Sequence, residues 1–387
     1  MSEIHSLLGA LGLIALVVAA GYAVMALTAV VIWQSKEGVK STGRLPPVTV
    51  LKPLCGAEPG LYENLRSFCQ QDYPEFQIVF GVRDRDDPAL AVVARLLAEF
   101  PTLPIDVVVD PRQHGSNRKV SSLINMLGRA RHDVFVMADS DAYVGPDYLK
   151  IVTAPLLDRK VGLVTCIYHG EPTARIWSRL GAMYVNEWYM PSVLMARLFG
   201  HQGYTSGQTI CMRRETLQGI GGLRAIADHL ADDYQLGELV RRLGLRIVLS
   251  PYVLQAEHHE PTLDLLVRHE VRWMRTLRVL RPRSFNLIFF GFSLPLAVLG
   301  LLLCAAGSMP STTVAWALFL ITVFARMALH FAHRLRGDRP LLADFWLVPA
   351  RDLLLCWVWW RTFFTSRITW RGSEFDVDAH GIMRSSS

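Results

Sequence analysis

The sequence predicts an α/β domain with a mostly parallel sheet, placed between apolar segments long enough to cross a membrane. Three observations support this fold class. The 387-residue chain is 51% hydrophobic with a mean hydropathy of +0.26, which is too apolar for an ordinary soluble enzyme. Its most apolar runs lie near the two ends, and strand-like and helix-like patterns alternate between them. Finally, three of the predicted strands end in acidic residues, which indicates a polar site at one edge of the sheet.

The apolar ends predict membrane-spanning helices. Residues 7–33 carry no charge and are numerous enough to cross a hydrocarbon core of ~30 Å at ~1.5 Å per residue. This run is too long for the apolar part of a signal peptide, so we interpret it as an anchor. Residues 285–308 and 312–331 predict a helical hairpin that turns at the sequence SMPS. Together with residues up to 364 they form a predicted C-terminal membrane region, followed by a tail at 365–387.

The segment 341–364 allows two interpretations. It is apolar, but it contains Asp344, Arg351 and Asp352, which are costly in lipid unless they face protein or water. It is either a third C-terminal span or an interfacial helix followed by a re-entrant piece. The final letters RSSS are interpreted as vector-derived or disordered.

Basic residues beside the spans predict the orientation of the chain. Cytoplasmic flanks are enriched in Lys and Arg, and all three basic flanks fall on one side of the predicted spans. They are Lys36, Lys40 and Arg44; the arginines between 275 and 283; and Arg334, Arg336 and Arg339. We therefore expect the region 45–284 to be cytoplasmic. The six cysteines form no CxxC pair, which agrees with a reducing compartment.

The central region, 45–260, alternates strands and helices. Such alternation indicates a mostly parallel sheet with right-handed crossovers, whose ligand site lies at the carboxyl ends of the strands. The predicted strands are 48–53, 76–84, 105–110, 134–139 and 162–170, and the predicted helices between them are 59–69, 88–100 and 119–130.

Carboxylates at the strand ends indicate a divalent cation. Asp84, Asp110, and the pair Asp139 and Asp141 follow predicted strands, and like charges so close together repel unless a positive group lies between them. No GxGxxG or GxxxxGK[ST] loop is present to hold phosphates. A cation that itself binds a diphosphate explains both facts, because Mg²⁺ and Mn²⁺ favour carboxylate and phosphate oxygens. Taken alone, the D-x-D sequence is more often a solvated turn.

Two other clusters accompany the D-x-D pair. Asn117, Arg118 and Lys119 lie near a predicted helix N-terminus, which favours an anion site, although an exposed basic turn is equally compatible. Asp232 and Asp233 open another predicted helix. One acidic residue is sufficient to cap that helix, so the other is a candidate general base.

Residues 261–283 predict an amphipathic helix on the membrane surface. Its arginines repeat every three or four residues and a second apolar stripe follows the same spacing. Most of these arginines are expected among lipid headgroups. Arg272 and Trp273 are candidates to point inward instead.

These motifs, in this order, resemble a known signature. Asp84, the D-x-D pair, Asp233 and the sequence HEVRW (269–273) resemble the D, D, D, (Q/R)xxRW pattern of membrane-bound inverting glycosyltransferases of the family-2 superfamily. The sequences RDRDDPA, LADDYQLG and RHEVRW are most similar to the ceramide glucosyltransferase family (family 21), which includes a bacterial hopanoid glycosyltransferase. Two features depart from the pattern: His269 replaces Gln or Arg, and Met190–Pro191 occupies the place of a His-Pro pair.

The resemblance implies a GT-A fold and a role for each motif. Asp84 would bind the uridine side of a UDP-sugar, and Asp139 with Asp141 would hold Mg²⁺ or Mn²⁺ on its diphosphate. Asn117, Lys119 and His269 would also contact the donor, and Asp233 would be the general base. Arg272 and Trp273 would lie over the diphosphate and the acceptor entrance. His259 is a weaker candidate for a third metal ligand.

The implied partners are a UDP-sugar, a lipid acceptor and the bilayer, with no nucleic acid. We expect a multi-pass protein of the bacterial inner membrane that transfers N-acetylglucosamine to a hopanoid, bacteriohopanetetrol. The alternative is glucosylation of ceramide from UDP-glucose. A processive polysaccharide synthase would share every motif, but three or four spans are few for a channel. A transporter or membrane scaffold would not explain the acidic strand ends.

Overall fold

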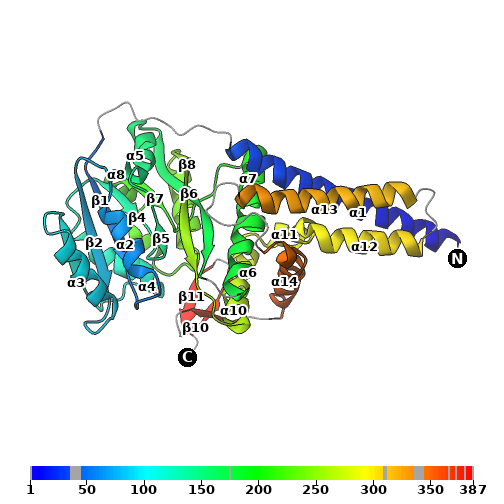
Figure 1. The fold of residues 1–387 in the computed structure, drawn as a ribbon. Helices are drawn as coiled ribbons and strands as arrows, with labels where there is room; N and C mark the ends of the chain where they lie inside the picture. Colours follow the sequence, from blue (N-terminus) through cyan, green and yellow to red (C-terminus); the bar gives the residue numbers. More distant parts are fainter. Residues whose placement is uncertain are drawn as a thin grey trace. The chain divides into compact units, whose positions relative to one another are not determined.

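The computed structural model describes residues 2–34, 45–173, 176–307, 312–334, 344–364, 367–370, 373–378 and 381–385 (Figure 1). The chain forms two compact units, which are described separately. The helical unit comprises Met1–Lys36, Ala174–Gly200 and Glu260–Ser366. The sheet unit comprises Glu37–Thr173, His201–His259 and Arg367–Ser387.

The sheet unit is built on an eight-stranded sheet with the order β3-β2-β1-β4-β7-β6-β8-β5. Strands β3, β2, β1 and β4 are parallel neighbours, as are β6 and β8, whereas β7 and β5 run antiparallel to their neighbours. The predicted mostly parallel sheet is confirmed. The strands are β1 Val48–Pro53, β2 Phe76–Val82, β3 Ile105–Val109, β4 Val134–Met137, β5 Ala142–Tyr143, β6 Val161–Pro172, β7 Ile210–Arg213 and β8 Arg246–His258.

Helices cover both faces of this sheet, which explains why its central strands are apolar on both sides. Val48 and Val50 of β1 belong to a core that includes residues of α2, α3 and α5. Leu51 belongs to a second core, shared with residues of α4, α8 and α9. The helices are α2 Leu61–Cys69, α3 Ala89–Glu99, α4 Arg118–Leu127, α5 Tyr148–Thr153, α8 Arg214–Gly219 and α9 Asp232–Arg242, with 3₁₀ turns at Ala154–Leu157 and Leu223–Ile226.

Three strands of the main sheet escaped prediction. β5 and β7 have only two and four residues, too few for a periodic pattern. β8 is long, but Ser250 and Pro251 interrupt its apolar residues, and its pairing with β6 changes register between Thr165 and Ile167. A proline removes one donor from the ladder, so it weakens the strand signal.

The tail forms a second sheet within the sheet unit. Its antiparallel strands are β9 Arg367–Trp370, β10 Ser373–Val377 and β11 Met383–Ser385, in the order β11-β10-β9. Phe375 and Met383 are buried together with Leu230. The alternative that RSSS is disordered is wrong for Arg384 and Ser385, which lie in β11, and the last two residues lie outside the described residues. That RSSS is vector-derived stays a prediction.

The helical unit holds the apolar segments. Helices α1, α12 and α13 pack side by side (Figure 1). α1 and α12 approach closely because Gly12 and Gly300 lack side chains: a Cβ on Gly12 would lie 2.7 Å from the Gly300 carbonyl oxygen. The helices of this unit are α1 Ser2–Gln34, α6 Ile176–Tyr184, α7 Met190–Leu198, α10 Leu263–Leu280, α11 Pro282–Phe285, α12 Ser293–Ala306, α13 Thr312–Arg334 and α14 Val348–Arg361, with a π-helix at Val185–Tyr189 and 3₁₀ turns at Asn286–Gly291 and Phe345–Leu347.

Two helices are long and apolar enough to cross a membrane, among the residues that the structure describes: Glu3–Gln34 in α1 and Thr312–Ala332 in α13. The predicted span 285–308 is wrong in its continuity. Pro282–Gly291 and Ser293–Ala306 meet at an angle of 70°, and together they would make a third span. Pro295 explains the break, because it has no N–H to bond the Gly291 carbonyl in a continuous helix. The predicted SMPS turn lies outside the described residues.

The segment 341–364 contains a short helix with buried charges. α14 has 14 residues, about 21 Å at ~1.5 Å per residue, which is less than the thickness of a hydrocarbon core. Arg351 donates to both carboxylate oxygens of Glu270 at 2.5 and 2.7 Å, and Asp352 accepts from Arg326. Asp344 pairs with Arg179 at 3.0 Å, so each of the three charged residues that the sequence marked as costly has a partner of opposite charge. Residues 341–343 lie outside the described residues.

The predicted amphipathic helix is α10, capped by Thr262, whose hydroxyl accepts from the Leu265 N–H at 3.3 Å. Its arginines are not equally exposed. Arg275 is buried, and Arg278 donates to the Thr362 carbonyl at 2.5 Å, so these two are held by protein rather than free for headgroups. Of the basic flanks used for orientation, Lys36, Lys40, Arg44, Arg336 and Arg339 lie outside the described residues.

Candidate active site

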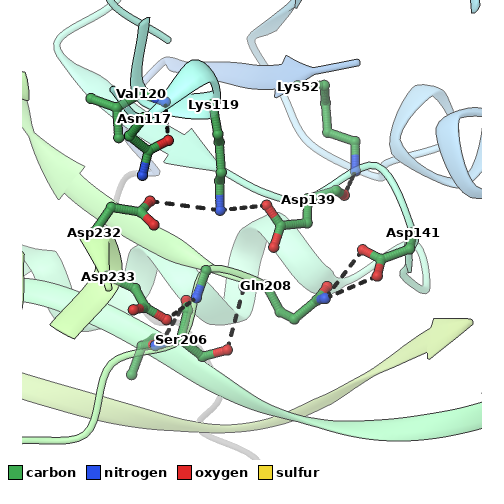
Figure 2. Close-up of polar contacts among 12 residues, drawn as sticks. Lys52, Asn117, Lys119, Val120, Asp139, Asp141, Ser206, Gln208, Asp232 and Asp233 are labelled. Atoms are coloured by element: carbon green, nitrogen blue, oxygen red, sulfur yellow. Dashed lines mark hydrogen bonds and ion pairs between the residues drawn. The ribbon is translucent and has the colours of Figure 1, made fainter. Parts of the chain in front are cut away.

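Two lysines contact Asp139, the first residue of the D-x-D pair (Figure 2). Asp139 follows β4, and its Oδ1 lies 2.5 Å from the Lys119 Nζ. Lys52, at the end of β1, donates from Nζ to the Asp139 backbone carbonyl at 2.5 Å. Because β1 and β4 are parallel neighbours, their carboxyl ends place these groups at one edge of the sheet. Lys119 therefore supplies a positive charge beside the Asp139 carboxylate from within the protein.

Asp141 is held differently, by an uncharged group. The Gln208 Nε2 lies 3.1 and 3.3 Å from its two carboxylate oxygens. Burial and the neighbouring charge of Asp139 raise the pKa of Asp141 to about 6. A second carboxylate whose charge is unfavourable in the unliganded protein is suited to receive a cation, because a cation restores the balance of charge.

Lys52 is a site residue that sequence reasoning missed. Its side chain is fully buried, and its Nζ lies 3.8 Å from the centre of the Phe68 ring. Burial lowers the pKa of Lys52 to about 7, although Asp141 and Asp139 act in the opposite direction. The signal was available: a lysine inside a strand that is otherwise buried on both faces needs a polar partner.

Lys119 lies between two acidic segments. Besides Asp139 it faces Asp232, with 3.8 Å between Nζ and Oδ2. Burial alone would lower the pKa of Lys119, but Asp139 and Asp232 outweigh it and hold the pKa above its usual value. Gly207 leaves room for this side chain, since a Cβ there would lie 2.7 Å from the lysine Nζ. Lys119 therefore stays charged beside the D-x-D pair.

Both polar groups of the Asn117 side chain are hydrogen-bonded to the backbone. It is the N-cap of α4: its side-chain oxygen accepts from the Val120 N–H at 3.0 Å, and its Nδ2 donates to the His229 carbonyl at 2.9 Å. The side chain is fully buried. These contacts make Asn117 a residue that positions Lys119, while its predicted contact with the donor stays a prediction.

The two acidic residues at the start of α9 have distinct surroundings. Asp232 faces Lys119, whereas Asp233 accepts from the Gly207 N–H at 3.0 Å and from the Tyr234 N–H at 2.7 Å. Burial and the charge of Asp232 raise the pKa of Asp233 to about 6. Burial also raises the pKa of Asp232, and Lys119 opposes that effect. A carboxylate that titrates near neutrality is suited to general-base work, so the predicted choice of Asp233 fits these surroundings.

Asp84 follows β2 at the same edge of the sheet and is exposed. Its neighbour Asp87 shapes the loop instead, because it accepts from the Gly56 N–H at 3.0 Å and from the Ala89 N–H at 2.9 Å. Asp84 is thus available for a ligand in a way that Asp87 is not.

The residues of the HEVRW sequence form a cluster of their own in the helical unit. The rings of His269 and Trp273 are 4.0 Å apart, and Trp273 also contacts Tyr184 at 5.2 Å. The His269 Nδ1 lies 3.0 Å from a Glu260 oxygen. Arg272 belongs to the same helix. The predicted roles of His269, Arg272 and Trp273 toward the donor and acceptor stay predictions.

His259 is bonded to a hydroxyl group at the start of the loop after β6. Its Nδ1 lies 2.9 Å from the Thr173 hydroxyl. Within the described parts of the chain, no group of three or more His, Cys, Asp or Glu side chains is arranged to hold a metal. The suggestion that His259 is a third metal ligand stays a prediction.

The chain combines a mostly parallel α/β sheet unit with a helical unit in which, among the described residues, two helices are long and apolar enough to cross a membrane. A mannosyltransferase from Pyrobaculum calidifontis, solved in complex with GDP-Man and Mn²⁺, has the same fold, with a TM-score of 0.56 and 21% identity over 92% of this chain and 99% of that one. The sequence profile of glycosyl transferase family 21 matches residues 11–383. The chain belongs to this family.

Curated relatives carry ceramide glucosyltransferase names. Ceramide glucosyltransferase 1 of Caenorhabditis elegans is 23% identical over 252 residues, which are 65% of this chain and 54% of the relative. Ceramide glucosyltransferase of Komagataella phaffii is 29% identical over 147 residues, 35% of this chain and 29% of the relative. The chain thus spans about half the length of the first of these relatives, and less of the second.

Proposed function

We propose that this protein transfers a sugar from a UDP-sugar to a hydroxyl group of a membrane lipid, with inversion at the anomeric carbon. One observation carries the proposal: a single edge of the sheet gathers the D-x-D pair, Lys119 and the half-buried carboxylate Asp233. Membership of glycosyl transferase family 21 supports the same reaction class.

The two carboxylates of the D-x-D pair fit a divalent cation. Asp139 and Asp141 would hold Mg²⁺ or Mn²⁺, and a cation held by two carboxylates would complete its coordination with phosphate oxygens and water. When bound, such a cation stabilises the negative charge that develops on the leaving UDP. Lys119 adds a fixed positive charge beside it. Asp84 would bind the uridine side of the donor.

The proton of the acceptor hydroxyl would pass to Asp233. The carboxylate is held by two backbone N–H groups, which fixes its position, and its pKa of about 6 leaves it mostly unprotonated at neutral pH. General-base help of this kind is typically worth ~10²–10⁴-fold in rate. His269, Arg272 and Trp273 are proposed to line the entrance for the acceptor.

A lipid acceptor explains why a transferase carries membrane-spanning helices. An amphipathic lipid keeps its body in the bilayer, since each CH₂ drawn into water costs ~0.8 kcal/mol. We place the protein in the bacterial inner membrane with the sheet unit in the cytoplasm. Two lipid acceptors are candidates. The Met190–Pro191 pair and the LADDYQLG sequence favour a hopanoid that receives N-acetylglucosamine, and the names of the relatives favour ceramide that receives glucose.

Transfer assays distinguish these acceptors. Purified full-length protein in lipid nanodiscs is offered bacteriohopanetetrol or ceramide, each with radiolabelled UDP-N-acetylglucosamine or UDP-glucose, and Mn²⁺ or Mg²⁺. A labelled lipid-soluble product supports the proposal, and its identity names the donor and acceptor. A labelled polymer would indicate a processive synthase instead, and no product in any combination would contradict glycosyl transfer to these lipids.

A pair of variants in one loop provides the matched control. Asp84→Asn should weaken UDP binding because the predicted uridine contact is lost. Asp86→Asn alters an equally exposed carboxylate two residues away and should bind UDP as the unmodified protein does. Equal UDP affinities in both variants would remove Asp84 from the site.

A further inference from the structure

The C-terminal sheet is hydrogen-bonded to the segment that leads into Asp233. The Met383 N–H donates to the Asp228 carbonyl at 2.8 Å, and the Leu230 N–H donates to the Gly381 carbonyl at 2.9 Å. His229 and Ile382 form an antiparallel bridge between these two bonds. Residues 381–383 therefore extend as a short strand along residues 228–230, three residues before Asp233.

The opposite side of the same segment is bonded to the turn that carries Lys119. The Asn117 N–H donates to the Ala227 carbonyl at 2.8 Å, and the Asn117 Nδ2 donates to the His229 carbonyl at 2.9 Å. Residues 227–230 are thus held between the start of α4 and the C-terminal strand. Lys119 follows Asn117 by two residues, and Asp233 follows the segment 227–230 by three. The hydrogen bonds between Asn117 and this segment therefore link the chain positions of Lys119 and Asp233.

Ser116 connects all three segments. Its N–H donates to the Asp228 carboxylate at 2.8 Å. Its hydroxyl lies 2.8 Å from the Met383 carbonyl and 3.0 Å from the same Asp228 carboxylate, and its single hydrogen can serve either acceptor. A residue beside the Lys119 turn, one before α9 and one near the end of the chain meet at this side chain.

The C-terminal sheet also makes apolar contacts with the same segment. Phe375 and Met383 are buried with Leu230, and Val377 packs against them. This cluster is separate from the two cores that hold the main sheet and its helices. The small sheet therefore contacts the segment 228–230 through both backbone hydrogen bonds and apolar side chains.

We propose that the C-terminal sheet β9–β11 is a positioning element that keeps Asp233 and Lys119 in register. The proposal rests on the proposed function, because it concerns the arrangement of the general base and the cation of that site. Loss of the contacts between the sheet and residues 228–230 should displace Asp233. A displacement of about 1 Å is enough to cost ~10²-fold in rate.

Two independent changes in the full-length protein test this proposal. Ser116→Ala removes the polar link, and Met383→Ala removes the apolar contact with Leu230; Ser116→Thr and Met383→Leu keep the hydroxyl and the volume, respectively. Arg384→Ala is the matched control in β11, since Arg384 is 75% exposed and pairs only loosely with Asp378 at 3.5 Å. We measure transfer kinetics, Mn²⁺-dependent UDP binding and hydrogen exchange of the Leu230 amide.

The expected result separates positioning from folding. Both alanine variants should lose on the order of 10–100-fold in kcat with little change in KM for the lipid, and Leu230 should exchange faster while β1 and β4 stay protected. The threonine and leucine variants should recover most of kcat, and Arg384→Ala should match the unmodified protein.

Two outcomes overturn the proposal separately from the proposed function. If the unmodified protein transfers sugar and the alanine variants keep its kcat while Leu230 exchanges faster, the sheet does not position the site. If kcat falls but Ser116→Thr and Met383→Leu restore nothing, the effect is not positional. Absence of transfer by the unmodified protein would overturn the proposed function and this inference together.

Discussion

Replacement of Asp233 by Asn tests the general base with little change of shape. In the protein, one carboxylate oxygen accepts from the Gly207 N–H and the other from the Tyr234 N–H. The Asn side chain has one oxygen and one NH₂ group, so it keeps one of these hydrogen bonds and loses the other. The amide cannot take a proton from an acceptor hydroxyl. Transfer should therefore fail while the donor site persists.

The expected loss of rate follows from the role of the base. Removal of general-base help should reduce kcat by ~10²–10⁴-fold, which corresponds to about 3–5 kcal/mol of barrier. Stability should change little. An unsatisfied buried N–H costs about 1–3 kcal/mol, and loss of a buried charge acts in the opposite direction.

The raised pKa of Asp233 predicts how stability and activity change with pH. The pKa of Asp233 is raised from 3.8 to about 6, so the folded protein binds this proton more tightly than the unfolded chain does. Its contribution to stability is therefore largest below about pH 4 and is lost as the pH rises to about 6, and Asp233→Asn should remove that dependence. Activity behaves oppositely: a group with a pKa near 6 is ~10% unprotonated at pH 5 and ~90% at pH 7, so kcat/KM should rise over this range.

The assay combines single-turnover transfer with calorimetric UDP binding. Asp233→Asn should bind UDP and Mn²⁺ normally and transfer almost nothing. Asp232→Asn is the matched control: it removes the more distant carboxylate near Lys119, at 3.8 Å, and leaves the Asp139 contact at 2.5 Å. It should cost some stability and at most a few-fold in rate. An inactive Asp232→Asn beside an active Asp233→Asn would show that the base is the neighbouring residue, and a flat profile of kcat/KM from pH 5 to 8 would refute the assignment altogether.

Three further predictions concern the charges around this site and in the helical unit. Asp139→Asn and Asp141→Asn should each abolish turnover and metal-dependent UDP binding in a protein that stays folded in detergent; full UDP affinity in both by calorimetry would reject a cation held by this pair. Lys52→Met should lower kcat about tenfold, because the Asp139 carbonyl loses its donor, with a melting temperature near that of the unmodified protein since no charge need be buried; unchanged kcat would contradict a role for Lys52 in the site. Arg351→Met should destabilise the helical unit by about 3–5 kcal/mol, because Glu270, only 1% exposed, loses its partner; thermal unfolding in detergent checks this, and addition of Glu270→Gln should restore most of the loss.

Local patterns determined the strands, several of the helices and the acidic positions of the site. β1, β2, β3 and β4 are apolar runs, and the carboxylates that follow β2 and β4 lie at one edge because parallel strands end together. The start of a predicted helix likewise placed Asp232 and Asp233 in the first turn of α9. Hydropathy likewise indicated α1 and α13. Each of these features depends on residues close together in the chain.

The tertiary structure decided the contacts between distant segments, which no local period encodes. Strand pairing of β1 with β4 brings the Lys52 Nζ to Asp139, 87 residues away, and the turn before β7 brings Gln208 to Asp141, 67 residues away. The different roles proposed for Asp232 and Asp233 follow from their different neighbours: Lys119 lies beside Asp232, whereas two backbone N–H groups bond Asp233. The contact of the Ser116 hydroxyl with Met383 spans 267 residues. Such pairings arise only when the whole chain folds, because backbone hydrogen bonds and burial select them among many sequence-compatible alternatives.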